Sequence, residues 1–315
     1  MFLVPRKPRL EYEGAVYHVM NRGDHREPIF LDDSDYELFL KTLDETCQKT
    51  GFQIHAYCLM PNHFHLVVET PGANLVAGMR WLLSTYTARF NRRRKFFGHL
   101  FSGRYKAMIV DGSSGGYLRR VCNYVHLNPV RAGLVRAGQP LWAFRWSSYP
   151  AYLRPARQRP SWLRVERLLG ELNLTKDNPR SRLVMQEYME KWRTQEADLE
   201  YKGLGRGWFF GDNALKEQLL EKLGRQESRP SYQGEPGKQS AEQQAHRLVA
   251  EALKKQGWTE DHLTRRPKGD PIKIKIAAEL RSRTTMTRAW VVQRLNMGTV
   301  THLAHLLYWR DRKKK

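Results

Sequence analysis

The sequence predicts an α+β fold: an antiparallel sheet of ferredoxin-like type with helices packed on it, followed by an all-α C-terminal region. Two observations carry this prediction. Residues 15–127 alternate strand-like and helix-like segments in the order β-α-β-β-α-β-α, whereas the patterns beyond about residue 160 are helical. A hydrophobic content of 41% supports a real core, and 315 residues are enough for two or three domains.

Each element of the first half is recognised by its hydrophobic period and by its ends. The first strand ends in a glycine turn, and the first helix has an acidic start and Gly51 just past its end. Pro61 and Asn62 form a tight connection between the second and third strands. The expected elements are strand 15–23, helix 32–51, strands 52–60 and 63–69, helix 74–94, strand 105–111 and helix 116–127.

The second half divides by composition. A polar stretch with proline, glycine and few large apolar residues predicts a linker, and three short helical patterns follow it. The last two patterns, 287–295 and 299–309, are joined by a glycine turn, as in a helix-turn-helix in which Thr299 caps the recognition helix. An ordinary three-helix bundle is the alternative. The expected regions are 1–155 (the α+β domain), 156–224 (a helical extension), 225–245 (the linker) and 246–315 (a helix-turn-helix-like domain).

The distribution of positive charge along the chain indicates what kind of partner the protein binds. The formal net charge is +22, and residues 70–165 hold 17 Lys and Arg against a single acidic residue, Asp111. Such a segment favours a polyanion, because neutralising phosphates releases their counterions. A basic surface kept for solubility is the alternative, but solubility is better served by mixed charges. The candidate nucleic-acid contacts are Arg92, Arg93, Arg94, Arg104, Arg119, Arg120, Thr299 and His302.

The sequence argues against several classes of protein. No apolar run approaches the ~20 residues that span a bilayer, and the N-terminus lacks the apolar core of a signal peptide. The expected location is therefore the cytoplasm. The three cysteines form no CxxC pair, which argues against a disulfide framework and a structural zinc site.

The run "MPNHFHLVVE" predicts a rigid pair of nitrogen donors. In a strand, alternate side chains share a face, so His63 and His65 lie together while the apolar Phe64, Leu66 and Val68 line the other face. Two exposed histidines on a half-buried strand are the ordinary alternative. A second run, "NYVHLNPVRAGLV", shifts this balance, since helical spacing is expected to place a phenol and a carboxamide one turn apart.

That second run supplies candidate chemistry. Tyr124 offers a phenolic nucleophile, and Asn128 offers an oxygen that would join two imidazoles on a divalent ion with open positions. Pro129 is expected to end the helix. Tyr117, seven residues earlier, is the alternative nucleophile, and His126 is expected to turn away from the shared face.

In this order, "YHVMNRG", "HAYCLMPNHFHLVVE" and "YVHLNPVRAGLV" resemble the single-tyrosine HUH transposases, with REP-associated tyrosine transposases as the best match. The resemblance covers residues 10 to 150. It implies that His63 and His65 are metal ligands for Mg²⁺ or Mn²⁺, that Tyr124 is the nucleophile, and that Asn128 holds the position of a third ligand. It also implies single-stranded DNA, often with hairpin ends, as substrate, and a location at the bacterial nucleoid.

The expected function is thus metal-dependent cleavage and rejoining of single-stranded DNA through a 5′-phosphotyrosine. One alternative is a sequence-specific DNA-binding regulator whose HUH site is idle. Another is an RNA-binding protein, although the strand "YKAMIV" lacks the aromatic pattern of the RNA-recognition fold. The C-terminal region could contact duplex DNA. The sequence leaves a homodimer open, and no membrane partner is expected.

Overall fold

The computed structural model describes residues 9–113, 115–136, 138–194, 207–227 and 235–312. Its first part has the predicted order of elements and ends on a third helix that packs across the sheet. The bounds are β1 Ala15–Arg22, the 3-10 turn η1 Asp24–Arg26, α1 Asp33–Thr50, β2 Gln53–Met60, β3 His63–Thr70, α2 Leu75–Arg94, β4 Lys106–Val110 and α3 Tyr117–His126.

The sheet has the strand order β2-β3-β1-β4-β5. The first four strands pair antiparallel in the ferredoxin-like arrangement that the sequence predicts. The fifth strand, β5 Phe209–Phe210, pairs parallel with β4. The sheet is therefore mixed rather than purely antiparallel, because the region expected to be only helical returns one short strand to its edge.

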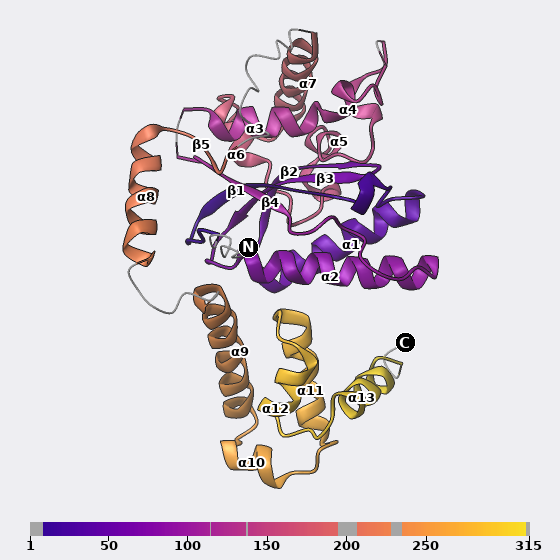
Figure 1. The fold of residues 1–315 in the computed structure, drawn as a ribbon, viewed down its shortest axis with the longest axis vertical. Helices are drawn as coiled ribbons and strands as arrows, with labels where there is room; N and C mark the ends of the chain where they lie inside the picture. The colour runs from indigo at the N-terminus through magenta and orange to yellow at the C-terminus, as the bar shows by residue number, and fades with distance from the viewer. Residues whose placement is uncertain (1–8, 114, 137, 195–206, 228–234, 313–315) are drawn as a thin grey trace, which may run out of the picture.

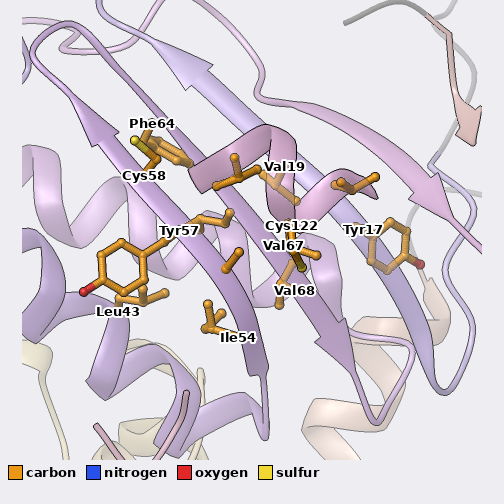
Figure 2. Close-up of a cluster of buried hydrophobic side chains, with 14 of the residues drawn as sticks. Tyr17, Val19, Leu43, Ile54, Tyr57, Cys58, Phe64, Val67, Val68 and Cys122 are labelled. Atoms are coloured by element: carbon orange, nitrogen blue, oxygen red, sulfur yellow. The ribbon is translucent and has the colours of Figure 1, made fainter. Parts of the chain in front are cut away.

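Helices cover both faces of this sheet (Figure 1). Helices α1 and α2 lie on one face, and α3 with the segments that follow it lies on the other. Figure 2 shows part of the core, where side chains of β1, β2 and β3 meet Leu43 of α1 and Cys122 of α3. The following elements are α4 Asn128–Arg131, η2 Leu141–Ala143, α5 Tyr149–Tyr152, η3 Ala156–Gln158, α6 Glu166–Glu171, α7 Pro179–Thr194 and α8 Asn213–Glu227.

The C-terminal part is a helical bundle with its own buried core. Its elements are α9 Glu235–Lys255, α10 Glu260–Arg265, α11 Pro271–Arg283, α12 Arg288–Arg294 and α13 Val300–Arg312. The expected linker is helical at both ends, since α8 runs to Glu227 and α9 begins at Glu235, and 228–234 lie outside the described residues. The other domain boundaries stay a prediction.

The bundle packs on the outer side of α1 and α2 (Figure 1). The contact centres on Lys49 of α1, whose Nζ donates to the carbonyl oxygen of Arg281 and, at 3.1 Å, to that of Ser282. The ammonium also lies 5.0 Å from the centre of the Trp81 ring. One lysine thus caps the C-terminal end of α11 and joins the two cores. Among the described residues, no helix combines the length and apolar character needed to cross a membrane.

Candidate active site

The two histidines of β3 share one face of the sheet, as the strand period predicts. His65 contacts the ring of Tyr124 on α3, with ring centroids 6.0 Å apart. Phe64, between the histidines, points the other way and packs on Phe39 of α1 with centroids 5.0 Å apart. The neighbouring apolar residues of β3 on that side are also buried. The side chains of β3 thus divide into a row that begins with the two histidines and continues with the buried Val67, facing α3, and an apolar row facing α1.

His65 is held by a third histidine, His18 of β1. His18 Nε2 lies 3.0 Å from His65 Nδ1, and the two rings stack with centroids 5.2 Å apart. Met20 is opposite His65 in the strand pairing, so His18 is its diagonal neighbour on the same face. This contact engages Nδ1 of His65 and leaves Nε2 as the nitrogen that could bind a ligand. The sequence alone assigned His18 no role, because its place on the histidine face depends on the pairing register of β1 and β3.

His63 is held by its chain neighbour, Asn62. The carboxamide oxygen of Asn62 lies 2.7 Å from His63 Nδ1, while its Nδ2 donates to the carbonyl oxygen of Arg26 at 3.0 Å. Gly23 N also donates to the backbone oxygen of Asn62, at 2.8 Å. A Cβ on Gly23 would lie 2.1 Å from the Glu27 carbonyl oxygen, so only glycine allows this close approach. Asn62 is thus fixed by backbone contacts and in turn fixes the His63 ring.

Both histidines are neutral at neutral pH. Burial, together with the charge of Arg22, lowers the pKa of His63 to about 4. Burial also lowers the pKa of His65 well below its usual value, with His18 and His63 adding to the effect. A neutral imidazole with one nitrogen engaged is the form in which histidine binds a metal ion.

The structure brings Tyr124 to these histidines. Its ring meets His18 edge to face, with centroids 5.8 Å apart, in addition to its contact with His65. The guanidinium carbon of Arg131 lies 4.1 Å from the centre of the Tyr124 ring, and Nη2 of Arg131 donates to the Tyr124 carbonyl oxygen. Tyr117 instead packs on Phe210 of β5, with ring centroids 5.2 Å apart. Of the two candidate nucleophiles, only Tyr124 contacts the histidines.

The relation of Asn128 to Tyr124 differs from the expected single helix. Helix α3 ends at His126, and Asn128 begins the separate short helix α4. Pro129 lies in the first turn of α4 and does not terminate α3, which has already ended two residues earlier. Asn128 still lies beside Tyr124, because its Nδ2 donates to the carbonyl oxygens of Tyr124 at 3.1 Å and of Val125 at 3.4 Å. The side chain thus caps α3 and stays close to the phenol-bearing turn.

His126 is structural. Its Nε2 lies 2.7 Å from the Ser148 hydroxyl, and its ring contacts those of Tyr149 and Tyr152. Full burial lowers the pKa of His126 to about 3. It therefore turns away from the Tyr124 face, as expected, and has no surface to offer to DNA.

The candidate arginines fall into different environments. Arg94 bonds the buried Asp35 at 2.6 Å and Arg93 pairs with Asp32 at 3.2 Å, so both hold α2 to the start of α1. Arg120 lies over the Phe210 ring at 5.0 Å, in the neighbourhood of Tyr117. Arg131, which sequence reasoning passed over, is the arginine that lies on the Tyr124 ring. Arg92 and Arg104 are exposed, and DNA contacts by any of these side chains stay a prediction.

In the C-terminal bundle, Thr299 caps α13 as expected, since its Oγ1 accepts the backbone N–H of His302 at 3.1 Å. His302 is exposed on the first turn. Of the described side chains in α13, only Leu303 is buried, while Tyr308 and Trp309 stand about half exposed. The helix pair and its turn are present, but DNA recognition by α13 stays a prediction.

Among known proteins, this chain is similar to a family model and to several solved structures. The family model described as "Transposase IS200 like" matches residues 11–128, which include both histidines, Tyr124 and Asn128. No curated protein matches the chain. A solved structure of a REP-associated tyrosine transposase bound to a REP hairpin aligns at 14% identity and a TM-score of 0.40, covering 52% of this chain and 92% of that one. A TM-score of this size supports no conclusion, so the comparison depends on the family model: residues 11–128 are similar to the IS200-like transposases.

Proposed function

We propose that the protein cuts and rejoins single-stranded DNA through a covalent bond between Tyr124 and a DNA 5′-phosphate. The observation that carries this proposal is the contact between the Tyr124 ring and His65, on the same sheet face as His63. A phenol beside two neutral imidazoles suits transfer of a phosphoryl group to tyrosine. If Tyr124 were only a packing residue, no histidines would be required beside its ring, so the contact favours a chemical role.

His63, His65 and the carboxamide oxygen of Asn128 are the residues that would hold Mg²⁺ or Mn²⁺. Within the described residues, no three His, Cys, Asp or Glu side chains gather as a metal site. The carboxamide oxygen of Asn128 would be a third donor of a different type. The donors fit such an ion, because both histidines are neutral and each has Nδ1 engaged by a neighbour. When bound, the ion would polarise the scissile phosphodiester and leave positions for phosphate oxygen and water.

The covalent step belongs to Tyr124. Its phenolic oxygen loses its proton and attacks phosphorus, and the bond from phosphorus to the 3′-oxygen breaks. The released 3′-oxygen takes up a proton and becomes a hydroxyl, so one proton is lost and one is gained. Arg131 places positive charge beside the ring, where negative charge passes from the phenol to the phosphoryl group. The phosphotyrosine conserves the energy of the broken bond, so a 3′-hydroxyl can reverse the step and rejoin strands.

Two neighbours would orient the donors. Asn62 holds His63, and His18 holds His65, each through the nitrogen that faces away from the proposed ligand. Such outer contacts fix the ring and its tautomer, and their loss commonly weakens metal binding ~10- to 100-fold.

Further parts of the proposal rest on the sequence. The basic segment 70–165 would bind the DNA backbone, and hairpin-forming single strands are the expected substrate. Helix α13 would contact duplex DNA as the second helix of a helix-turn-helix, with the region from 246 onward as its domain. The protein would act at the nucleoid. A homodimer is compatible with this scheme and is not required by it.

The competing function is a DNA-binding regulator whose site is idle. The experiment that separates the two incubates the full chain with end-labelled hairpin DNA and Mn²⁺, followed by a denaturing gel. The proposal expects a labelled band at the mass of protein plus DNA, lost when EDTA is added. DNA binding with no covalent band would favour the idle regulator.

A further inference from the structure

The loop that follows α2, residues 95–104, presents an unusual side chain to solvent. Phe97 is 96% exposed, the highest value among the exposed large hydrophobic residues of the described chain. Its neighbour Phe96 is 52% exposed and packs on Phe90, with ring centroids 6.1 Å apart. A phenylalanine this exposed buries almost no apolar surface in the fold, so its ring is free to contact a partner.

The backbone holds this loop in a defined shape. Lys95 ends α2 in the left-handed conformation, with φ of 57°. Phe96 N donates to the Asn91 carbonyl oxygen at 2.9 Å, and Asn91 Nδ2 donates to the Gly98 carbonyl oxygen at 3.1 Å. Phe97 is therefore presented by a turn that is fixed on both sides.

The same loop is attached to the end of β1 that carries the candidate site. Asp24 N donates to the Leu100 carbonyl oxygen at 3.0 Å, and Ser102 N donates to that of Arg22 at 2.9 Å. Arg22 is the strand partner of His63. Leu100 is three positions after Phe97, at most about 11 Å along the chain, so the exposed ring lies near the histidine end of the sheet.

The positive charge of the loop indicates what kind of partner the exposed ring contacts. Between 75 and 110 the sequence contains no Asp or Glu, and the exposed cations of the loop are Lys95 and Arg104, with His99 between them. A basic loop with an exposed aromatic ring is a combination that binds single-stranded nucleic acid, with cations on phosphates and a ring under a base.

We propose that Phe97 is a stacking platform for one unpaired base of the single-stranded DNA that runs to the Tyr124 site. This inference rests on the proposed function for the identity of the strand. It adds a binding position outside the residues that perform the chemistry, and it commits to an unpaired base rather than to a protein surface.

The test measures binding apart from cleavage. The full chain carrying Tyr124→Phe is titrated into fluorescein-labelled single-stranded DNA, and anisotropy gives Kd for Phe97, Phe97→Ala and Phe97→Trp at several salt concentrations. Leu183→Ala on α7, which removes a side chain that is 54% exposed, is the matched control. We expect Phe97→Ala to raise Kd about tenfold, Phe97→Trp to restore or exceed wild-type affinity, and the control to change nothing.

Two further readouts make the result specific. Stacking is uncharged, so Phe97→Ala should keep the dependence of Kd on salt, whereas Arg104→Ala should reduce that dependence. An abasic site moved along the DNA should weaken wild-type binding at one position and leave Phe97→Ala unaffected there. An unchanged Kd in Phe97→Ala, or equal sensitivity to every abasic position in both proteins, would overturn the platform. A covalent band in wild-type protein alongside either result would show that the proposed function stands without it.

Discussion

The two faces of β3 show how one strand can serve both stability and chemistry. Toward α1 and α2 it presents Phe64, Leu66 and Val68, all fully buried among apolar side chains. Toward α3 it presents the buried Val67 and the two histidines, His63 and His65. The ring nitrogens of these histidines contact Asn62 and His18. The apolar face needs only shape and volume, whereas each polar group on the other face needs a specific neighbour.

This difference explains where the unexpected residues lie. Asn62 and His18 both belong to the polar side and contact the Nδ1 atoms of the two histidines. A mutation on the apolar face should therefore cost stability and spare chemistry, and one on the polar face should do the reverse. The following predictions test this division, in order of decreasing effect.

The largest effect is expected for His65→Ala. Loss of a proposed metal ligand beside Tyr124 should abolish the covalent band with hairpin DNA while single-stranded DNA binding stays near normal, because the basic surface supplies the affinity. The matched control is His55→Ala, since His55 is also buried in the sheet but bonds Glu69 at 2.9 Å. The control should lose stability and keep the band. A normal band in His65→Ala would contradict the account.

On the apolar face, Phe64→Ala should lower the free energy of unfolding by about 3–5 kcal/mol, because the ring is fully buried and leaves a cavity. Guanidinium unfolding followed by circular dichroism measures this change. His63→Ala, next to it but only partly buried, should cost clearly less. An equal loss of unfolding free energy in the two variants would show that the two faces do not differ in their contribution to stability.

A smaller effect is expected for the residues that orient the histidines. Asn62→Ala should weaken Mn²⁺ binding, measured by calorimetry, by about 10- to 100-fold without unfolding the chain. Asn62→Asp, which keeps the acceptor for His63, should recover part of the affinity. Asn74→Ala removes a similar side-chain bond, to the Thr50 carbonyl oxygen, and should leave Mn²⁺ affinity unchanged. Identical losses in the Asn62 and Asn74 variants would assign Asn62 a purely structural role.

The smallest effect is expected in the C-terminal bundle. If α13 reads duplex DNA, His302→Ala should weaken binding to a selected duplex site by roughly fivefold, at the low end for one base contact, and spare the covalent band. His246→Ala, an exposed histidine on α9, is the control. Equal binding by both variants would indicate that the bundle does not contact DNA.

The sequence predicts most of the α+β domain because its signals are local. Strand alternation places the histidines and Phe64 on opposite faces, and Gly51 ends α1 in the left-handed conformation as its position indicates. The short strand β5 was missed, since two residues carry no readable period and their pairing with β4 depends on contacts far along the chain. The helix at the start of α9 was missed because proline, glycine and glutamine there indicate a linker.

For the site, the sequence identifies the donors and misses their supports. The break between α3 and α4 at Leu127 could not be foreseen from helical spacing, which treats Tyr124 and Asn128 as one continuous turn. Arg131 was assigned no role, because its contact with the Tyr124 ring depends on how α4 folds back. Such contacts depend on tertiary packing, which no local pattern encodes.

The central claim is that Tyr124 forms the bond to DNA. Mass spectrometry of the protease-digested covalent complex tests it most directly, by finding which peptide carries the nucleotide. The account predicts a 5′-phosphotyrosine at Tyr124, absent in Tyr124→Phe and of normal yield in Tyr117→Phe. A nucleotide attached to Tyr117, or a complex of normal yield in Tyr124→Phe, would contradict it.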